Sequence, residues 1–424
     1  MQLRDYKHVH CIGIGGIGLS AIARYCHTEG AVVTGSDTIT SHLIKQLQKE
    51  GMIIYDDGHK NTNLSSDTDL VIYTIAIKGT NPEFIEAKSR GIMCMSYPEA
   101  LGELTKEYTT IAVCGTHGKT TTTAMVASML QACGESPTVI VGSLLAEGGT
   151  NFIKGNGKYL VVEACEYRRS FLNLHPTHVI VTNIDEDHLD YYKDITDIRS
   201  AFQSFVDMIP SNGSLITHAD VSLITQGKRI DEDEVDISSI ELSVLGIHNK
   251  SNAQLALSLA RDLSLNEEDA RRGLKNFKGT WRRLEYKGIW HDIALYDDYG
   301  HHPKEIKASL QALREKYPHG KYTLIVVFQP HLFSRTKLFL DDFSQAFSDA
   351  DKVCIMPIYA SREQDDETIS SHDLVEKTHN AIYMESFKEI QKYVLNRPHY
   401  HCVLVTIGAG DVYYFHEELE NVQY

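Results

Sequence analysis

Short runs of β-branched and other apolar residues recur along the whole chain, and stretches with helical periodicity separate them. Clear examples are VHCIGI, AVVTGS, LVIYTIA, TTIAVCG, YLVVEA, HVIVTNI, YTLIVVF and CVLVTIG. Strands that alternate with helices pair in parallel, and apolar runs without strict alternation indicate sheets that helices cover on both faces. The pattern therefore predicts an α/β protein built on parallel sheets.

The chain of 424 residues is too long for one typical hydrophobic core. Two seams divide it: the polar stretch ELTKEY precedes the strand TTIAVCG, and a helical pattern ends near 277–280 before WRRLEYKGI. We expect three α/β domains, at residues 1–106, 107–277 and 278–424. Within the second domain, GKRIDEDEVDISS is acidic and aperiodic, which predicts a loop or a short irregular excursion.

The composition is that of an ordinary globular protein, with 42% hydrophobic and 23% charged residues and a net charge of −16. The acidic balance and the lack of a basic run argue against nucleic-acid binding. No apolar stretch is long enough for a membrane span, and the N-terminus does not resemble a signal peptide. The eight cysteines form no CxxC pair, so we expect neither a disulfide framework nor a cysteine zinc site, but a cytoplasmic protein.

The stretch CIGIGGIGLSAIA predicts a strand end, a glycine turn and a helix from Ile17 to Cys26. The spacing of Gly13, Gly15, Gly16 and Gly18 opens the helix N-terminus, with its unpaired N–H groups, to an anion. The next strand ends in Ser36 and Asp37, about twenty residues later, where NAD-binding proteins place an acid on the ribose. Taken alone, this loop favours a dinucleotide such as NAD, and a purely structural turn or another nucleotide such as UDP stays open.

A second glycine loop, GTHGKTTTT, follows the strand TTIAVC and opens another helix. Backbone N–H groups, a lysine charge and a threonine hydroxyl that can ligate Mg²⁺ are the parts of a cradle for the phosphates of ATP. The spacing is not the standard one, which needs glycine where Val113 stands. We assign ATP binding to Gly115, Thr116, His117, Gly118, Lys119, Thr120 and Thr121. Two nucleotide-type loops in one chain argue against a simple dehydrogenase.

Acidic residues and a histidine follow two later strands. Glu163 ends YLVVE, and Asn183, Asp185, Asp187 and His188 come after HVIVT. Because the carboxyl ends of parallel strands meet at one edge, a carboxylate and an imidazole there can face Thr120 and hold the Mg²⁺ of ATP and a second divalent ion. The histidine leaves Mn²⁺ open as well. The alternative interpretation is that DEDHLD is a solvated acidic loop.

Taken together, the motifs resemble the Mur ligase family over nearly the whole chain. In order they are GIGGIGLSAIA, YTIAIKGTNPE, GTHGKTTTT, VVEACE, TNIDEDHLDYY, HNKSNA, RRLE, DDYGHHP and FQPHLFSRT. The resemblance implies a Rossmann-like N-terminal domain for a UDP-substrate, a P-loop-type central ATPase domain and a Rossmann-like C-terminal domain. It also implies an amide ligase of peptidoglycan precursor synthesis, in which ATP phosphorylates the carboxylate of UDP-N-acetylmuramate and L-alanine attacks the acyl phosphate.

The resemblance assigns roles residue by residue. The first loop would seat the diphosphate of the UDP-sugar, through Gly13, Gly15, Gly16, Ile17, Gly18, Ser36 and Asp37. Thr120 and Glu163 would hold one Mg²⁺ and His188 the second. The adenine nucleotide would contact His248, Asn249, Asn252, Arg283 and Asp298, with Arg283 at the γ-phosphate. Tyr299, His301, His331 and Arg335 would surround the amino acid, with Arg335 at its carboxylate. The predicted catalytic residues are Lys119, Glu163, His188, Arg283 and His301.

Several of these positions also have a purely structural interpretation. Only one of two adjacent arginines in an extended chain points inward, so Arg282 is expected at the surface. His302 and His331 could be buried core histidines, and Tyr299 could pack in the core.

The sequence also departs from the family pattern. Cys165 and Leu332 stand where many relatives have an acid and a basic or polar residue, respectively. The interval from His188 to His248 is short, which predicts a reduced scaffold with intact chemistry.

Other functions stay open at this point. A related Mur-type ligase would add another amino acid or a tripeptide to UDP-N-acetylmuramate. A nicotinamide-dependent oxidoreductase is disfavoured by GTHGKTTTT, and a Mur-like subunit of an amidase complex by the lack of a cysteine zinc ribbon in the sequence. Both a monomer and a homodimer agree with the sequence.

Overall fold

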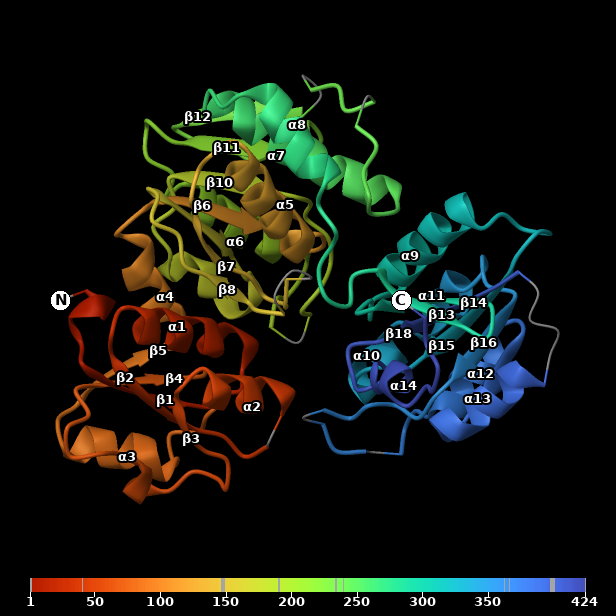
Figure 1. Cartoon of the computed structure of the whole chain (residues 1–424), viewed down its shortest axis with the longest axis horizontal. Coiled ribbons are helices and arrows are strands. Elements are labelled where there is room, and N and C mark those ends of the chain that lie inside the picture. Colours follow the sequence, from red (N-terminus) through yellow and green to blue (C-terminus); the bar gives the residue numbers. More distant parts are fainter. Residues whose placement is uncertain are drawn as a thin grey trace. The chain divides into compact units, whose positions relative to one another are not determined.

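The computed structural model describes residues 2–39, 41–145, 149–189, 191–232, 235–238, 240–361, 363–365, 367–396 and 401–423. Their strands form three sheets, one in each of the three predicted segments (Figure 1). The parallel α/β class predicted from the apolar runs is confirmed. No helix of the described residues is long and apolar enough to cross a membrane.

The first sheet has the order β3-β2-β1-β4-β5, and all its strands are parallel. Its strands are β1 (His8–Ile12), β2 (Val32–Ser36), β3 (Ile53–Tyr55), β4 (Leu70–Tyr73) and β5 (Met93–Ser96). The helices between them are α1 (Ile17–Thr28), α2 (His42–Lys49), α3 (Pro82–Ser89) and α4 (Tyr97–Thr105). The glycine loop follows β1, which is paired on both sides, so it lies at a central position of the carboxyl edge.

The second sheet has the order β12-β11-β10-β6-β9-β7-β8, with β8 antiparallel to β7. Its strands are β6 (Thr109–Cys114), β7 (Thr138–Ile140), β8 (Phe152–Ile153), β9 (Tyr159–Glu163), β10 (His178–Val181), β11 (Ser214–Thr217) and β12 (Lys228–Asp231). The helices are α5 (Lys119–Ala132), the 3-10 helix η3 (Tyr167–Asn173), α6 (Ile195–Val206), α7 (Ile247–Asp262) and α8 (Glu267–Lys275). Strand β6 lies between β9 and β10, so the second glycine loop is flanked by the acidic ends of both.

The third sheet has the order β13-β14-β18-β15-β16-β17, with β13 antiparallel to β14. Its strands are β13 (Glu285–Trp290), β14 (Ile293–Asp298), β15 (Thr323–Phe328), β16 (Lys352–Ile355), β17 (Ala381–Tyr383) and β18 (Cys402–Ile407). The helices are α9 (Pro303–Lys316), α10 (Phe333–Leu338), α11 (Leu340–Ala346), α12 (Ser371–Lys377), α13 (Phe387–Leu395) and α14 (Tyr414–Glu417). Strand β18 returns between β14 and β15, so the order of the strands reverses beside it. Ligands of open α/β sheets bind at such a reversal.

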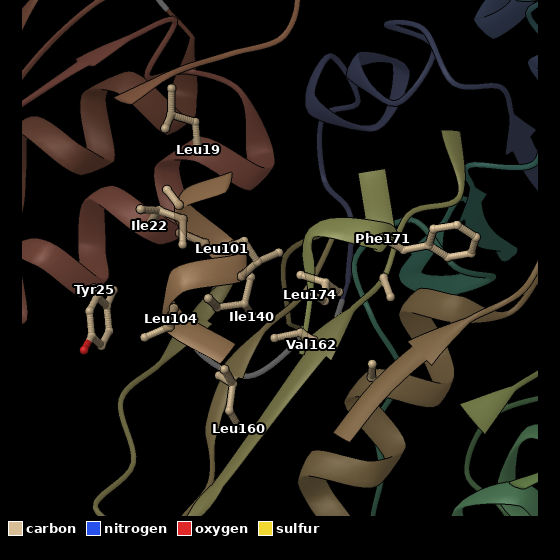
Figure 2. Close-up of a cluster of buried hydrophobic side chains, with 14 of the residues drawn as sticks. Leu19, Ile22, Tyr25, Leu101, Leu104, Ile140, Leu160, Val162, Phe171 and Leu174 are labelled. Carbon is tan, nitrogen blue, oxygen red and sulfur yellow. The ribbon is translucent and has the colours of Figure 1, made fainter. Parts of the chain in front are cut away.

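The first two sheets are joined by one hydrophobic core. Figure 2 shows Leu19, Ile22 and Tyr25 of α1 and Leu101 and Leu104 of α4 in one cluster with side chains of β7, β9 and η3. The two segments pack so closely that a Cβ atom on Gly102 would lie 2.2 Å from the backbone oxygen of Asn173. A side chain at this position would force α4 away from η3.

The described chain accordingly divides into two compact units. Residues 1–241 and 251–277 form the first, and 242–250 and 278–424 form the second. The expected domain boundaries at 106 and 277 stay predictions. One local expectation was wrong: Lys228–Asp231 of the acidic segment forms the edge strand β12, because the free edge of β11 pairs with it and Ile230 is buried.

Candidate functional site

The first glycine loop borders a cavity of about 580 Å³ at the carboxyl edge of the first sheet. Gly13, Gly16 and Asp37 line it, together with His59 and Lys78. The turn forms because the N–H groups of Gly13 and Ile14 both donate to the Ser36 oxygen, and Gly13 has a φ of +80°. The Asp37 carboxylate accepts the Gly15 N–H at 2.9 Å, so this acid is held by the glycine loop itself.

Gly18, Ile17 and Ser36, which were assigned to the same ligand, do not line this cavity. A Cβ on Gly18 would lie 2.5 Å from the ring of Tyr97, so Gly18 permits α1 to pack against α4. Ile17 begins α1, and its carbonyl accepts the Ser20 hydroxyl at 2.9 Å. Ser36 is fully buried.

The hydroxyl of Ser36 donates to Glu83 at 2.6 Å and lies 2.9 Å from His59 Nδ1. The Glu83 carboxylate lies 3.1 Å from the same nitrogen of His59. Sequence analysis missed His59 and Glu83, although Glu83 belongs to the quoted motif YTIAIKGTNPE.

The second glycine loop is held by the residues that follow β10. Asn183 accepts the His117 N–H at 2.9 Å and donates to the His117 oxygen at 3.0 Å. The Asp185 N–H donates to the Thr116 hydroxyl at 2.8 Å. Gly115 has a φ of +138°, and a Cβ there would lie 2.0 Å from the Thr182 hydroxyl. Asn183 and the backbone of Asp185 therefore support the loop.

Gly118 and Lys119 lie where the loop enters α5. Gly118 adopts the left-handed conformation and directly precedes the helix, whose first N–H groups are open to an anion. The Lys119 ammonium donates to the backbone oxygens of Gly115 and Thr116 at 2.6 and 3.0 Å and to Glu166 at 3.0 Å. Burial alone would lower the pKa of Lys119, but the negative charges of Glu166 and Glu163 and the hydrogen bond to Glu166 together raise it.

Glu166 is a site residue that sequence analysis missed. Its side chain is 3% exposed, and its carboxylate lies 3.0 Å from Lys119 and 3.5 Å from His188 Nε2. Burial alone would raise the pKa of Glu166, but the Lys119 charge and the contact with His188 lower it. The available signal was a second carboxylate three residues after Glu163 in VVEACE.

The predicted metal ligands surround this pair. The Glu163 carboxylate accepts the Gly142 N–H at 2.8 Å, and Thr120 and Thr121 are buried in the first turn of α5. His188 faces Glu166, and its backbone has a φ of +54°. No cluster of three or more His, Cys, Asp and Glu side chains arranged for a metal exists among the described residues. The donors present are nevertheless those that Mg²⁺ accepts, because carboxylate and hydroxyl oxygens predominate among them.

The motif HNKSNA begins α7. Asn252 lies beside the phosphate loop, since a Cβ on Gly118 would lie 2.8 Å from its side-chain oxygen. Asn249 donates to the Leu245 oxygen at 2.7 Å, and burial lowers the pKa of His248. His248 and Asn249 belong to the second unit, and their contact with a nucleotide stays a prediction.

In the second unit, Asp298 ends β14 and organises two turns. Its carboxylate accepts the N–H groups of Leu284 at 2.7 Å and of Gly300 at 2.8 Å. Burial raises the pKa of Asp298 to about 6, against the opposing charge of Arg283. The Arg283 guanidinium lies 5.2 Å from the centre of the Tyr299 ring. Arg283 and Asp298 thus lie close enough for their charges to interact, and their contact with a nucleotide stays a prediction.

The four residues assigned to the amino acid form one group. The Tyr299 and His301 rings lie 5.5 Å apart, and those of His301 and His331 lie 6.2 Å apart. Arg335 Nη1 lies 3.2 Å from His331 Nδ1. His302 is buried and accepts the Lys304 N–H at the start of α9, which confirms its structural interpretation.

The expectation that Arg282 lies at the surface was wrong. Its side chain is 2% exposed, and Nε donates to Asp297 at 2.9 Å. Arg282 adopts a φ of +56°, so the chain turns here, and the extended geometry assumed for the two adjacent arginines does not hold.

Known protein families match the chain along nearly its whole length. Three models match in order: the Mur ligase family catalytic domain over residues 8–109, the Mur ligase middle domain over 113–235 and the Mur ligase glutamate ligase domain over 282–410.

Two relatives are UDP-N-acetylmuramate–L-alanine ligases. That of Acetivibrio thermocellus is 41% identical over 448 positions, covering 96% of this chain and 94% of the relative. That of Lachnospira eligens is 41% identical over 451 positions, covering 97% of each chain. The crystal structure of UDP-N-acetylmuramate–alanine ligase from Thermotoga maritima superposes with a TM-score of 0.81 at 28% identity, over 97% of each chain. Both alignments exceed the 424 residues of this chain, so these relatives have residues without a counterpart here.

Proposed function

The chain belongs to the Mur ligase family, and we infer that it joins L-alanine to the carboxylate of UDP-N-acetylmuramate with the conversion of ATP to ADP and phosphate. The observation that carries this conclusion is the 41% identity to L-alanine ligases along nearly the full length of both chains. It covers the phosphate loop and the residues assigned to the amino acid alike. The resemblance predicted from the motifs is confirmed.

The reaction needs two substitutions. A carboxylate oxygen of the muramyl group attacks the γ-phosphorus of ATP, the bond from that phosphorus to the bridging oxygen breaks, and ADP leaves. The amine nitrogen of L-alanine then attacks the acyl carbon. Phosphate leaves with the activated oxygen, and the amine loses its proton to form the amide. Phosphorylation is required because an unmodified carboxylate oxygen is a poor leaving group.

The first step brings anions together, and the residues around α5 offset their charge. We assign the phosphates to the N–H groups at the start of α5 and to Lys119, which releases Glu166 when a phosphate takes its place. Thr120, Glu163, Glu166 and His188 supply the donors for Mg²⁺, with Mn²⁺ as an alternative. A bound divalent ion supplies neutralisation of phosphate charge. The carboxylate that Lys119 releases becomes available as a donor.

The cavity beside the first glycine loop suits the UDP portion of the substrate. Its volume of about 580 Å³ falls in the range of small-molecule sites. Lys78 and His59 in its lining offer cationic or donor groups to a diphosphate, and Gly13 and Gly16 permit close approach of the backbone. We therefore place the UDP-sugar, and not NAD, in this loop.

In the second unit, Arg283 and Asp298 are assigned to the nucleotide and the group of Tyr299, His301, His331 and Arg335 to L-alanine. Two histidine rings beside one guanidinium suit a small zwitterion, because the guanidinium binds the carboxylate and an imidazole can accept an amine proton. We assign that proton to His301. A ligase that adds another amino acid or a tripeptide is the alternative.

The function is tested by measuring ADP release with Mg²⁺, ATP, UDP-N-acetylmuramate and single amino acids. We expect release to require both the nucleotide sugar and an amino acid, with L-alanine preferred over glycine and L-serine. Lys119→Ala should abolish turnover, because positioning of the phosphates supplies most of the rate. ADP release that ignores the nucleotide sugar contradicts the ligase assignment, and a tripeptide preferred over L-alanine favours the alternative.

A further inference from the structure

The arginine that precedes Arg283 has no role in the proposed chemistry, yet it is buried in the second unit and hydrogen-bonded there through all three guanidinium nitrogens. Arg282 is 2% exposed, and every nitrogen of its guanidinium is bonded. Nε donates to Asp297 at 2.9 Å, Nη1 donates to the Gly410 oxygen at 3.0 Å, and Nη2 donates to the Gly408 oxygen. Three acceptors from two separate segments are therefore held by one side chain.

The backbone of Arg282 is fixed as well. Its oxygen accepts the Tyr299 N–H at 2.6 Å, and its N–H donates to the Glu285 carboxylate at 3.0 Å. Arg282 and Leu284 both adopt positive φ angles, of +56° and +46°, which are unfavourable for residues with a side chain. A turn of this kind persists only where surrounding contacts determine it.

Arg283 lies between these two residues, and its direction therefore depends on them. Leu284 is fixed on the other side by its N–H, which donates to Asp298. The ring of Tyr299 lies 5.2 Å from the guanidinium carbons of both arginines. Arg282 and Arg283 therefore share the Tyr299 ring as a neighbour.

The same guanidinium reaches the turn that follows β18, and this turn leads to the amino-acid group. Gln329 donates to Asp411 at 2.6 Å and accepts the Val412 N–H at 3.1 Å. Two residues later the chain reaches His331. The carbonyls of Gly408 and Gly410 and the pair formed by Gln329 and Asp411 therefore connect Arg282 to the start of the segment that carries His331 and Arg335.

The carboxylate that pairs with the Arg282 charge, that of Asp297, is itself held by further contacts. Asp297 also accepts the Thr406 hydroxyl at 2.6 Å, and Thr406 lies 2.7 Å from His416 Nε2. The rings of Trp281 and Tyr413 lie 5.7 and 4.6 Å from the guanidinium. A planar, bidentate cation fits these partners in a way that a lysine ammonium does not.

We propose that Arg282 is a positioning residue, which directs Arg283 toward the nucleotide and fixes the turn Gly408–Gly410 behind the amino-acid group. The proposal rests on the proposed function of Arg283 at the γ-phosphate. Lysine at position 282 retains the charge but cannot hold Asp297, Gly408 and Gly410 together. The turn then relaxes, and Arg283 is displaced from its direction.

The test is a kinetic double-mutant cycle in the full chain, with Arg282→Lys, Arg283→Ala and the double variant. We expect Arg282→Lys to lower kcat/KM for ATP on the order of 10- to 100-fold, as a displacement of about 1 Å does. KM for UDP-N-acetylmuramate should stay within about twofold, because those contacts are assigned to the first unit. In the Arg283→Ala background, Arg282→Lys should add almost nothing to the loss in kcat/KM for ATP, since it acts through Arg283.

Arg314→Lys is the matched control. Arg314 is also a buried arginine of the second unit, and it donates to Asp351 at 2.7 Å and to backbone oxygens of Asp349 and Tyr322 at 2.7 and 3.1 Å. We expect it to lower Tm about as much as Arg282→Lys but to leave kcat/KM for ATP unchanged. Equal kinetic losses in the control would reduce the role of Arg282 to stability and overturn the proposal.

The remaining outcomes distinguish a failure of the positioning role of Arg282 from a failure of the function proposed for Arg283. If the two single losses in kcat/KM for ATP multiply in the double variant, Arg282 does not act through Arg283, and only the positioning role is overturned. If Arg283→Ala turns over at nearly the wild-type rate, the assignment of Arg283 is overturned and the proposal with it. If Arg282→Lys does not fold, Asp297→Asn takes its place in the cycle. It retains an acceptor for Nε and removes the matching charge, and the same expected and contrary results apply.

Discussion

Removing the Glu166 side chain should destabilise the phosphate loop by leaving a buried charge unmatched. In Glu166→Ala, the Lys119 ammonium, on a side chain that is 15% exposed, loses the carboxylate that lies 3.0 Å away. Breaking a buried ion pair by deleting one partner costs about 3–5 kcal/mol. The ammonium retains the oxygens of Gly115 and Thr116, so we expect the lower end, about 3 kcal/mol of unfolding free energy.

The double variant decides whether that loss comes from the pair. In Lys119→Met the lone charge is instead the Glu166 carboxylate, which is 3% exposed and lies 3.5 Å from His188. Deleting both charges leaves none unmatched, so Glu166→Ala with Lys119→Met should cost about 2–3 kcal/mol less than the sum of the single losses. Glu166→Gln is the matched control, because it retains the volume and one acceptor, and we expect a loss of about 1–2 kcal/mol.

The measurement is urea unfolding followed by circular dichroism, together with hydrogen exchange of the peptides of β6 and α5. Exchange isolates the first unit, which circular dichroism does not. Tryptophan fluorescence supplies an internal reference, because Trp281 and Trp290 both belong to the second unit. Single losses that add in the double variant would refute the charge argument, and the contact between Lys119 and Glu166 would then be of no energetic consequence.

Three further predictions test other parts of the molecule. Arg335→Ala should raise KM for L-alanine at least about tenfold and KM for ATP less than about twofold, because the guanidinium is assigned to the amino-acid carboxylate. Initial rates measure both constants, and equal changes in the two would remove Arg335 from the amino-acid pocket. Gly18→Ala should cost about 1–3 kcal/mol in urea unfolding, because its Cβ would meet Tyr97 at 2.5 Å, and Tyr97→Leu should recover part of that loss; an undiminished loss with Tyr97→Leu would contradict the clash. Burial raises the pKa of Asp298 to about 6, above the usual aspartate value of 3.8, so between these two values the folded state binds more protons than the unfolded state and the free energy of unfolding falls as pH rises. Asp298→Asn should therefore gain about 2 kcal/mol relative to wild type from pH 4 to 6, and a constant difference across this window would contradict the shift.

The fold was readable from the sequence where one local pattern sufficed. Apolar runs predicted β1, β6, β10 and β18, because burial on both faces makes a central strand mostly apolar. Strand β12 was missed because an edge strand is half exposed, and only Ile230 of its four residues is buried. The free edge of β11, and not the composition of the segment, decides its conformation.

The sequence predicted those parts of the site in which the residue types alone indicate the chemistry. A glycine loop with a lysine before a helix predicts phosphate binding by itself, and the amino-acid group came from the resemblance. Arg282 was assigned to the surface because arginines are usually exposed. Its burial depends on Gly408 and Gly410, which lie 126 and 128 residues away in the sequence. Glu166 was passed over because its partner Lys119 lies 47 residues earlier. Pairings over such separations follow from topology, and no periodicity within a segment reveals them.

A glycine turn follows a central strand in each of the three sheets, and the comparison explains why glycines alone do not identify a ligand. Gly13, Gly115 and Gly408 all have positive φ angles, of +80°, +138° and +151°, and come directly after β1, β6 and β18. The first two turns open a helix and present N–H groups, which suits phosphates. In the third turn the carbonyls point inward to a buried arginine, so the turn serves as an attachment point and not as an anion seat. What distinguishes them is the partner supplied by a neighbouring segment: Asp37 for the first turn, Glu166 with Lys119 for the second and Arg282 for the third. The ligand of a glycine turn is therefore to be inferred from those partners and only secondarily from the spacing of the glycines.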